Sequence, residues 1–225
     1  MRLLPALMLL AAGLPVQAER MTFTPVDQAE RDPTLVTFRA NLLANIAARD
    51  TEAVVAVACP DIYLSHGGNG GPRELRENLT LPADTLAEEY RDQADEMREA
   101  YWSALEETLA APGYFDDLGE FWMPYQWKIG LPASVDPFNA YFVNGSGVSL
   151  RVGADRTADI VDLISHEVVL ISEYDPDAEY QKVMLTDGAR GFMHRDYLWP
   201  MTGHRAALVK SDQGEWQLCT FVGGD

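Results

Sequence analysis

Residues 143–199 constrain the fold of this chain most strongly, because short apolar runs alternate there with turn residues. The run Val148–Val152 alternates apolar and polar side chains, which is the period-two pattern of a half-buried strand. Four more β-type runs follow it, at residues 160–164, 167–171, 180–185 and 190–193. Asp187-Gly188 separates the last two runs and predicts a hairpin, since this turn requires positive φ. Five short strands in one stretch predict a small β-barrel.

Residues 1–18 have the organisation of a secretory signal peptide. Arg2 is the positive start, Leu3 to Leu14 form the apolar segment, and the residues up to Ala18 form a small-residue cleavage site. The apolar run is shorter than the roughly 18–20 residues that a membrane span needs. We therefore expect cleavage after Ala18, a periplasmic or secreted protein, and no membrane span after signal removal.

The charge of the chain restricts its partners. The formal net charge is −18, and it becomes one unit more negative when Arg2 is removed with the signal peptide. Such a chain repels nucleic acid and anionic lipid surfaces. No basic patch with interleaved aromatic residues is present in the sequence, so we expect no nucleic-acid partner.

Two cysteines, Cys59 and Cys219, lie in the predicted mature region. An exported protein meets an oxidising compartment, which favours a disulfide between them. The alternative is two buried free thiols on neighbouring elements. We predict the disulfide, which would close a loop of about 160 residues and would stabilise the fold by roughly 4–5 kcal/mol in the chain-entropy model.

The residues before the strand-rich stretch predict helices. Asp32 suits the N-cap of a helix and Pro33 its first position. The clearest helical period runs from residue 84 to residue 110, with an apolar stripe from Leu86 to Leu109. At the other end of the chain, residues 204–222 predict a hairpin.

The strand-rich stretch resembles a known family. The runs Val148 to Gly153, Ile160 to Leu163, Tyr180 to Val183 and Gly191 to Met193, ending in Tyr197-Leu198, resemble the signature of the bacterial SH3-like (SH3b) family. Tyr180 stands where the family usually has tryptophan, and Phe192-Met193 stands where it has Trp-Val. The resemblance covers about a quarter of the chain and implies an SH3-like barrel with an aromatic ligand groove. On this basis, we expect Tyr180, Phe192 and Tyr197 to be groove residues. The whole layout also resembles exported, SH3-containing bacterial proteins of unknown function.

We therefore expect an α+β fold in which an SH3-like barrel is inserted in a helical or α+β domain. The expected segments are a signal peptide at 1–18, an N-terminal helical or α+β domain with an aromatic linker at 19–142, the barrel at 143–199, and a C-terminal hairpin at 202–225. The hairpin carries enough apolar surface to need a partner. A disulfide between Cys59 and Cys219 would make the N-terminal domain that partner.

A glycine-rich loop precedes a predicted helix start at Pro72. Its candidate residues are His66, Gly67, Gly68, Gly70 and Gly71. Glycines expose backbone N–H groups, and before a helix N-terminus these could bind an anion or an oxyanion. The alternative is an ordinary glycine-rich turn. Neither a G-x-S-x-G elbow nor a Gly-Lys-Ser/Thr phosphate loop accompanies it in the sequence.

The remaining reactive side chains form no catalytic pattern. The four histidines, at positions 66, 166, 194 and 204, include no i,i+4 pair, so we expect no metal site. Cys59 precedes a proline turn and Cys219 lies in a predicted strand, so both are interpreted as structural. Asp175 to Glu179 alternates like a calcium loop but lacks glycine at the sixth place, and is interpreted as an acidic turn. We expect no cofactor.

These observations favour an exported, non-catalytic binding or interaction protein of the bacterial envelope. Its barrel would contact a peptide, cell-wall material such as peptidoglycan, or an envelope protein. Two alternatives stay open. One is an envelope hydrolase using the 62–73 loop, for which a nucleophile or metal would be needed. The other is a small-ligand-binding, cystatin-like domain, for which an apolar cavity between helix 33–49 and the final hairpin would be needed.

Overall fold

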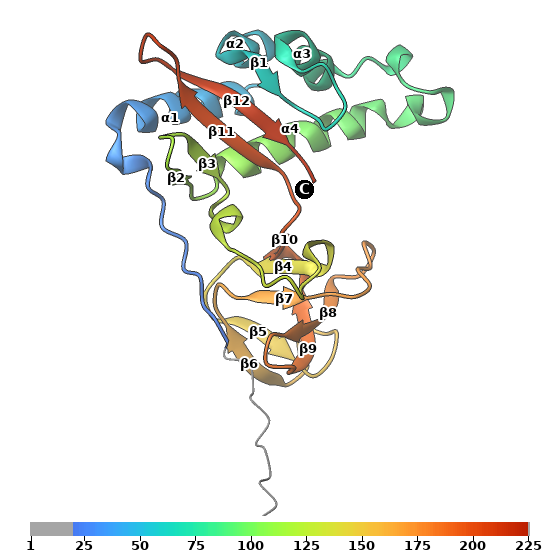
Figure 1. The fold of residues 1–225 in the computed structure, drawn as a ribbon. Coiled ribbons are helices and arrows are strands. Elements are labelled where there is room, and N and C mark those ends of the chain that lie inside the picture. The colour runs from blue at the N-terminus through green and yellow to red at the C-terminus, as the bar shows by residue number, and fades with distance from the viewer. Residues whose placement is uncertain (1–19, 225) are drawn as a thin grey trace, which may run out of the picture.

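The computed structural model describes residues 20–224, so the predicted signal peptide lies outside the described residues. The chain has a mixed α+β fold with two sheets (Figure 1). The first sheet packs with the α-helices, and we call these elements together the helical unit. The second sheet lies below the helical unit in the view of Figure 1, and the segment before the first α-helix runs between the two.

The helical unit contains four α-helices. They are α1 (Pro33–Ala47), α2 (Thr51–Ala56), α3 (Gly71–Thr80) and α4 (Ala94–Ala110). Asp32 caps α1 as predicted, because its carboxylate accepts the backbone N–H groups of Thr34 and Leu35. Lys210 also donates to this carboxylate at 2.6 Å, and this hydrogen bond lowers the pKa of Asp32. No helix within residues 20–224 combines the length and the apolar character that crossing a membrane requires.

The predicted helix at 84–110 is wrong in its first part. Residues 83–85 and 88–93 form two short 3-10 helices, and the α-helix begins only at Ala94. Tyr90 and Met97, expected in the apolar stripe, are 48% and 41% exposed. Helices in proteins depend mainly on packing of an apolar face. Ala94, where the α-helix begins, is the first buried residue of this stretch, and the other buried residues lie at Trp102 and beyond. The residues before Ala94 therefore gain little from an α-helical conformation.

The first sheet joins the two ends of the described chain. Its order is β1 (Ala58–Tyr63), β12 (Trp216–Val222), β11 (Arg205–Lys210), β3 (Phe121–Met123) and β2 (Tyr114–Phe115). β1 and β12 are parallel, and the other pairs are antiparallel. The predicted C-terminal hairpin, β11 and β12, therefore lies inside the sheet with N-terminal strands on both sides. Its buried residues Leu218 and Phe221 share one core with Leu35, Leu42 and Ile46 of α1.

The second sheet contains seven antiparallel strands. In order of hydrogen bonding they are β10 (Leu198–Pro200), β4 (Ala140–Val143), β7 (Val168–Leu170), β8 (Tyr180–Leu185), β9 (Arg190–His194), β5 (Val148–Arg151) and β6 (Ile160–Ile164). All seven contribute to or border one buried core, so the sheet is curved. The five strand-forming runs predicted from the sequence are confirmed.

The expectation of a closed barrel needs correction. Within residues 20–224 no hydrogen-bonded pair joins β6 to β10, so the sheet has two free edges. The difference arises from β4 and β10, which the sequence did not reveal. They pair with each other and extend the sheet beyond β7. Pro200 is tolerated in β10 because this strand forms an edge.

A disulfide links β1 and β12, which are neighbours at one edge of the first sheet. Cys59 in β1 and Cys219 in β12 are bonded, with 4.8 Å between their Cα atoms and a sequence separation of 160. The predicted pairing is confirmed. The bond lies where the parallel pairing of β1 and β12 brings the two ends of the fold together.

Replacing both cysteines, Cys59→Ser with Cys219→Ser, is expected to lower the free energy of unfolding by about 4 kcal/mol, because the unfolded chain regains the entropy of a long open loop. Urea unfolding monitored by tryptophan fluorescence measures the change. Reductant should destabilise the wild type and leave the double variant unaffected. Two alkylatable thiols in the native wild-type protein would contradict the bond.

Candidate ligand groove

An open groove of about 590 Å³ lies on the outer side of the second sheet. It is formed by β5 and the turns beside it, the ends of β8 and β9, and the 3-10 turn Arg195–Tyr197. The lining residues are Ser146, Gly147, Val148, Ser149, Arg151, Ala154, Asp155, Arg156, Glu179, Tyr180, His194, Asp196 and Tyr197. Both charge signs are therefore present along it.

Three rings form the aromatic part of the groove. Tyr180 on β8 is the register partner of His194 on β9, and their ring centroids are 5.1 Å apart in an edge-to-face arrangement. Tyr197 contacts the same imidazole, with the centroids 6.4 Å apart. Two of the predicted groove residues thus meet around a histidine. His194 was not predicted as a groove residue, although the expected pairing of its strand with the 180–185 run places it opposite Tyr180.

Phe192, the third predicted groove residue, lies beside the groove. It pairs with Lys182 on β8 and with Arg151 on β5. It is two residues from His194 on the same strand, so its side chain lies on the same face of the sheet. The structure places it next to the residues that line the groove, and not among them.

The charged groups of the groove are partly held by the chain itself. Arg151 donates to the carbonyl oxygen of Ala158 at 2.7 Å. Hydrogen bonds from Thr157 lower the pKa of Asp155, which is therefore ionised at neutral pH. The carboxylate of Asp196 lies 3.4 Å from Nδ1 of His194. A ligand in the groove would meet these fixed charges and the three rings together.

The rim of the groove contains a serine–histidine contact. Oγ of Ser146 lies 3.0 Å from Nε2 of His166. Nδ1 of His166 is buried and has no hydrogen-bond partner within residues 20–224, so no carboxylate orients this imidazole. The neighbouring amide of Gly147 donates to Oγ of Ser165 and is not available to an oxyanion. The contact therefore lacks the third group and the oxyanion donor that acyl transfer uses.

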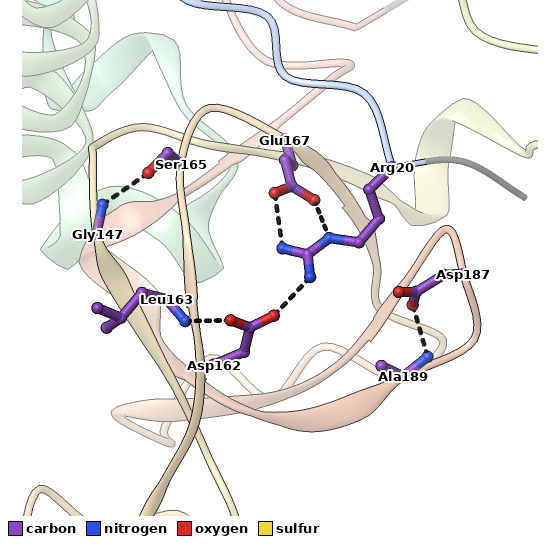
Figure 2. Close-up of polar contacts among 8 residues, drawn as sticks. All are labelled: Arg20, Gly147, Asp162, Leu163, Ser165, Glu167, Asp187 and Ala189. Atoms are coloured by element: carbon purple, nitrogen blue, oxygen red, sulfur yellow. Dashed lines mark hydrogen bonds and ion pairs between the residues drawn. The ribbon is translucent and has the colours of Figure 1, made fainter.

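Residues 20–23 form an N-terminal strap, which binds the segment 162–167 next to this rim. Figure 2 shows the guanidinium of Arg20 donating two hydrogen bonds of 2.8 Å to Glu167 and a third to Asp162. The hydrogen bond from Arg20 lowers the pKa of Asp162. Glu167 is only 6% exposed, so its charge needs this partner. Phe23 then donates to the carbonyl of His166 at 2.7 Å, which connects the strap to the rim.

Arg20→Met is expected to lower the free energy of unfolding by about 2–3 kcal/mol, because it leaves the carboxylate of Glu167 buried without a cation. Chemical denaturation measures the loss. The double variant Arg20→Met/Glu167→Met should recover much of it, since no unpaired charge remains. A single variant within about 0.5 kcal/mol of wild type would show that the pair contributes little.

The glycine-rich loop is occupied by a side chain of the protein itself. One carboxylate oxygen of Glu74, in the first turn of α3, accepts the amides of Asn69 and Gly70 at 2.9 and 2.8 Å. The amide of Gly68 donates to Ser65. The position of Gly70 requires glycine, because it has φ 65° and a Cβ there would lie 2.5 Å from the carbonyl oxygen of Ile62. Three amides at the centre of the predicted anion site, those of Gly68, Asn69 and Gly70, are thus satisfied internally.

The other predicted residues of the loop, His66, Gly67 and Gly71, do not form a pair of a nucleophile and a general base. Nδ1 of His66 lies 2.9 Å from the hydroxyl of Tyr63. Gly67, which lies in an exposed part of the loop, has open space around its Cα, and Gly71 begins α3. The loop is therefore organised as the start of a helix.

Glu74→Ala is expected to open this loop. The amides of Asn69 and Gly70 should exchange with solvent at least about tenfold faster, and the protein should lose about 1–2 kcal/mol of stability, because two charge-assisted hydrogen bonds are removed. Hydrogen exchange followed by NMR tests this. The matched control is Glu77→Ala on the same helix, whose exposed carboxylate accepts from Arg73. Equal exchange in both variants would contradict the assignment.

The acidic segment 175–179 forms a turn held by a buried amide. Gln181 is 2% exposed, accepts the N–H of Asp175 and donates to the carbonyl groups of Asp175 and Ala178. Within the described residues no group of three or more histidine, cysteine or acidic side chains is arranged to hold a metal ion. The turn therefore shapes the chain next to Glu179 and Tyr180 in the groove.

The chain was compared with known proteins. No protein-family model, no curated protein and no solved structure matches it.

Proposed function

We propose that this chain is an exported, non-catalytic binding protein of the bacterial envelope, and that the groove of the second sheet is its ligand site. The observation that carries the proposal is the row of Tyr180, His194 and Tyr197 in an open groove. Aromatic rings supply contact area with little conformational freedom to lose, which suits them to binding.

The resemblance to SH3-like domains supports this proposal. The runs that carry it occupy β5, β6, β8 and β9, and their inward side chains pack around one core. In this interpretation the second sheet is an SH3-like module. Export is supported by the organisation of residues 1–18 and by the disulfide, which forms in oxidising compartments.

The charges along the groove favour a peptide as the ligand. Arg151 and Arg156 can pair with carboxylates, while Asp155, Glu179 and Asp196 can pair with amino groups. A short peptide that carries both kinds of group, such as the peptide part of peptidoglycan, matches this arrangement. The strongly negative chain would select against ligands that are only anionic.

Purified peptidoglycan should retain the wild-type protein in a sedimentation assay, and Tyr180→Ala and Tyr197→Ala should each weaken retention about tenfold, because each removes a ring from the groove. Tyr90→Ala is the matched control, since Tyr90 is an exposed tyrosine of the helical unit. Equal partitioning of wild type and both groove variants would count against the proposal.

A further inference from the structure

A second hollow, of about 560 Å³, lies between the helical unit and the second sheet. Its walls come from α4, from the 3-10 turn Tyr125–Lys128 after β3, from β10, and from the connection between β10 and β11. In Figure 1 this place lies near β10, below α4. Ligand sites occur preferentially at such junctions between structural units. Asp196 is the only lining residue that it shares with the groove.

A mostly buried glutamine, Gln126, lies in its wall. Gln126 is 5% exposed, and its side chain makes no hydrogen bond to any of the residues 20–224. The amide atoms of Gln126 are not sealed from solvent, so they reach the hollow, where a bound group that both donates and accepts can hydrogen-bond to them. Asn144, on the side of the second sheet, also has a side-chain amide with no partner among the described residues.

The buried and half-buried residues that line the hollow, which we call its inner wall, are uncharged. Leu198 is buried and Trp199 is half-buried on β10, and Pro124 and Pro200 add further apolar surface. His204 stacks on Phe221 with the ring centroids 5.0 Å apart, and burial lowers its pKa, which favours the neutral imidazole. The charged residues Glu107, Arg195 and Asp196 are exposed and carry both signs.

We propose that this hollow binds a neutral saccharide. Hydroxyl groups donate and accept hydrogen bonds, as the side-chain amides of Gln126 and Asn144 do. The flat indole of Trp199 offers a surface for the C–H face of a sugar ring. The uncharged inner wall and the negative net charge of the chain disfavour an acidic sugar. This hollow is a different site from the peptide groove, so saccharide binding and peptide binding can be tested independently.

Isothermal titration of the full folded protein with two neutral trisaccharides, tri-N-acetylchitotriose and maltotriose, tests the proposal. At least one should bind the wild type. Gln126→Met keeps the side-chain volume but removes the amide, and it should weaken binding about tenfold. Trp199→Ala, at a less buried position, should weaken binding by a similar factor because it removes the indole surface. Tyr180→Ala in the groove should bind as the wild type does. Thermal unfolding verifies that each variant is folded before titration.

Three results would overturn the proposal. One is no binding of either neutral trisaccharide to the wild type. Another is binding that Trp199→Ala and Gln126→Met leave unchanged, or that Tyr180→Ala abolishes, because the sugar would then lie elsewhere. The third is tighter binding of trigalacturonic acid, the acidic control, than of both neutral sugars. Failure of peptidoglycan sedimentation with retained trisaccharide binding would reject the groove function and leave this site standing.

Discussion

The parallel pairing of β1 with β12 places the last strand of the chain beside a strand formed near its start. The Cys59–Cys219 disulfide fixes this pair, and two side-chain contacts add to it at the other end of the hairpin. Trp216 donates to Thr34 at 3.0 Å, and Lys210 donates to Asp32. Because the helical unit is closed in this way, the second sheet is connected to it through both of its ends, and the junction hollow has two defined walls.

The glycine-rich loop and Gln126 differ in whether their amides are available to a ligand. The glycine-rich loop resembles an anion site in sequence, yet Glu74 already supplies the anion. Gln126 belongs to no sequence motif, yet the structure places it in the lining of the junction hollow, with an amide that solvent can reach. Whether a polar group can take a ligand depends on what else satisfies it, since buried donors and acceptors are nearly always paired. That information lies in the tertiary contacts.

Local patterns predicted the fold where local interactions decide it. The strand runs of the second sheet, the cap at Asp32 and the cysteine pair followed from period, helix capping and compartment. The helix start at Ala94, the strands β4 and β10 and the free sheet edges depend on packing between distant segments, which residue order does not display. The site divides in the same way. Tyr180 and Tyr197 were predicted from a resemblance, while His194 and Gln126 became visible only through their neighbours.

The position of β12 also decides the order in which the chain can fold. The strands of the second sheet all come from residues 140–200, so this sheet can form as soon as that stretch is available. The first sheet lacks β11 and β12, which join β1 to β3, until residues 205–222 follow. Pairing across such a separation is slow, because the intervening chain must lose its entropy first. The second sheet can therefore form from pairings within one stretch of chain, while the apolar faces of α1–α4 stay uncovered until β11 and β12 pair with the other strands of the first sheet.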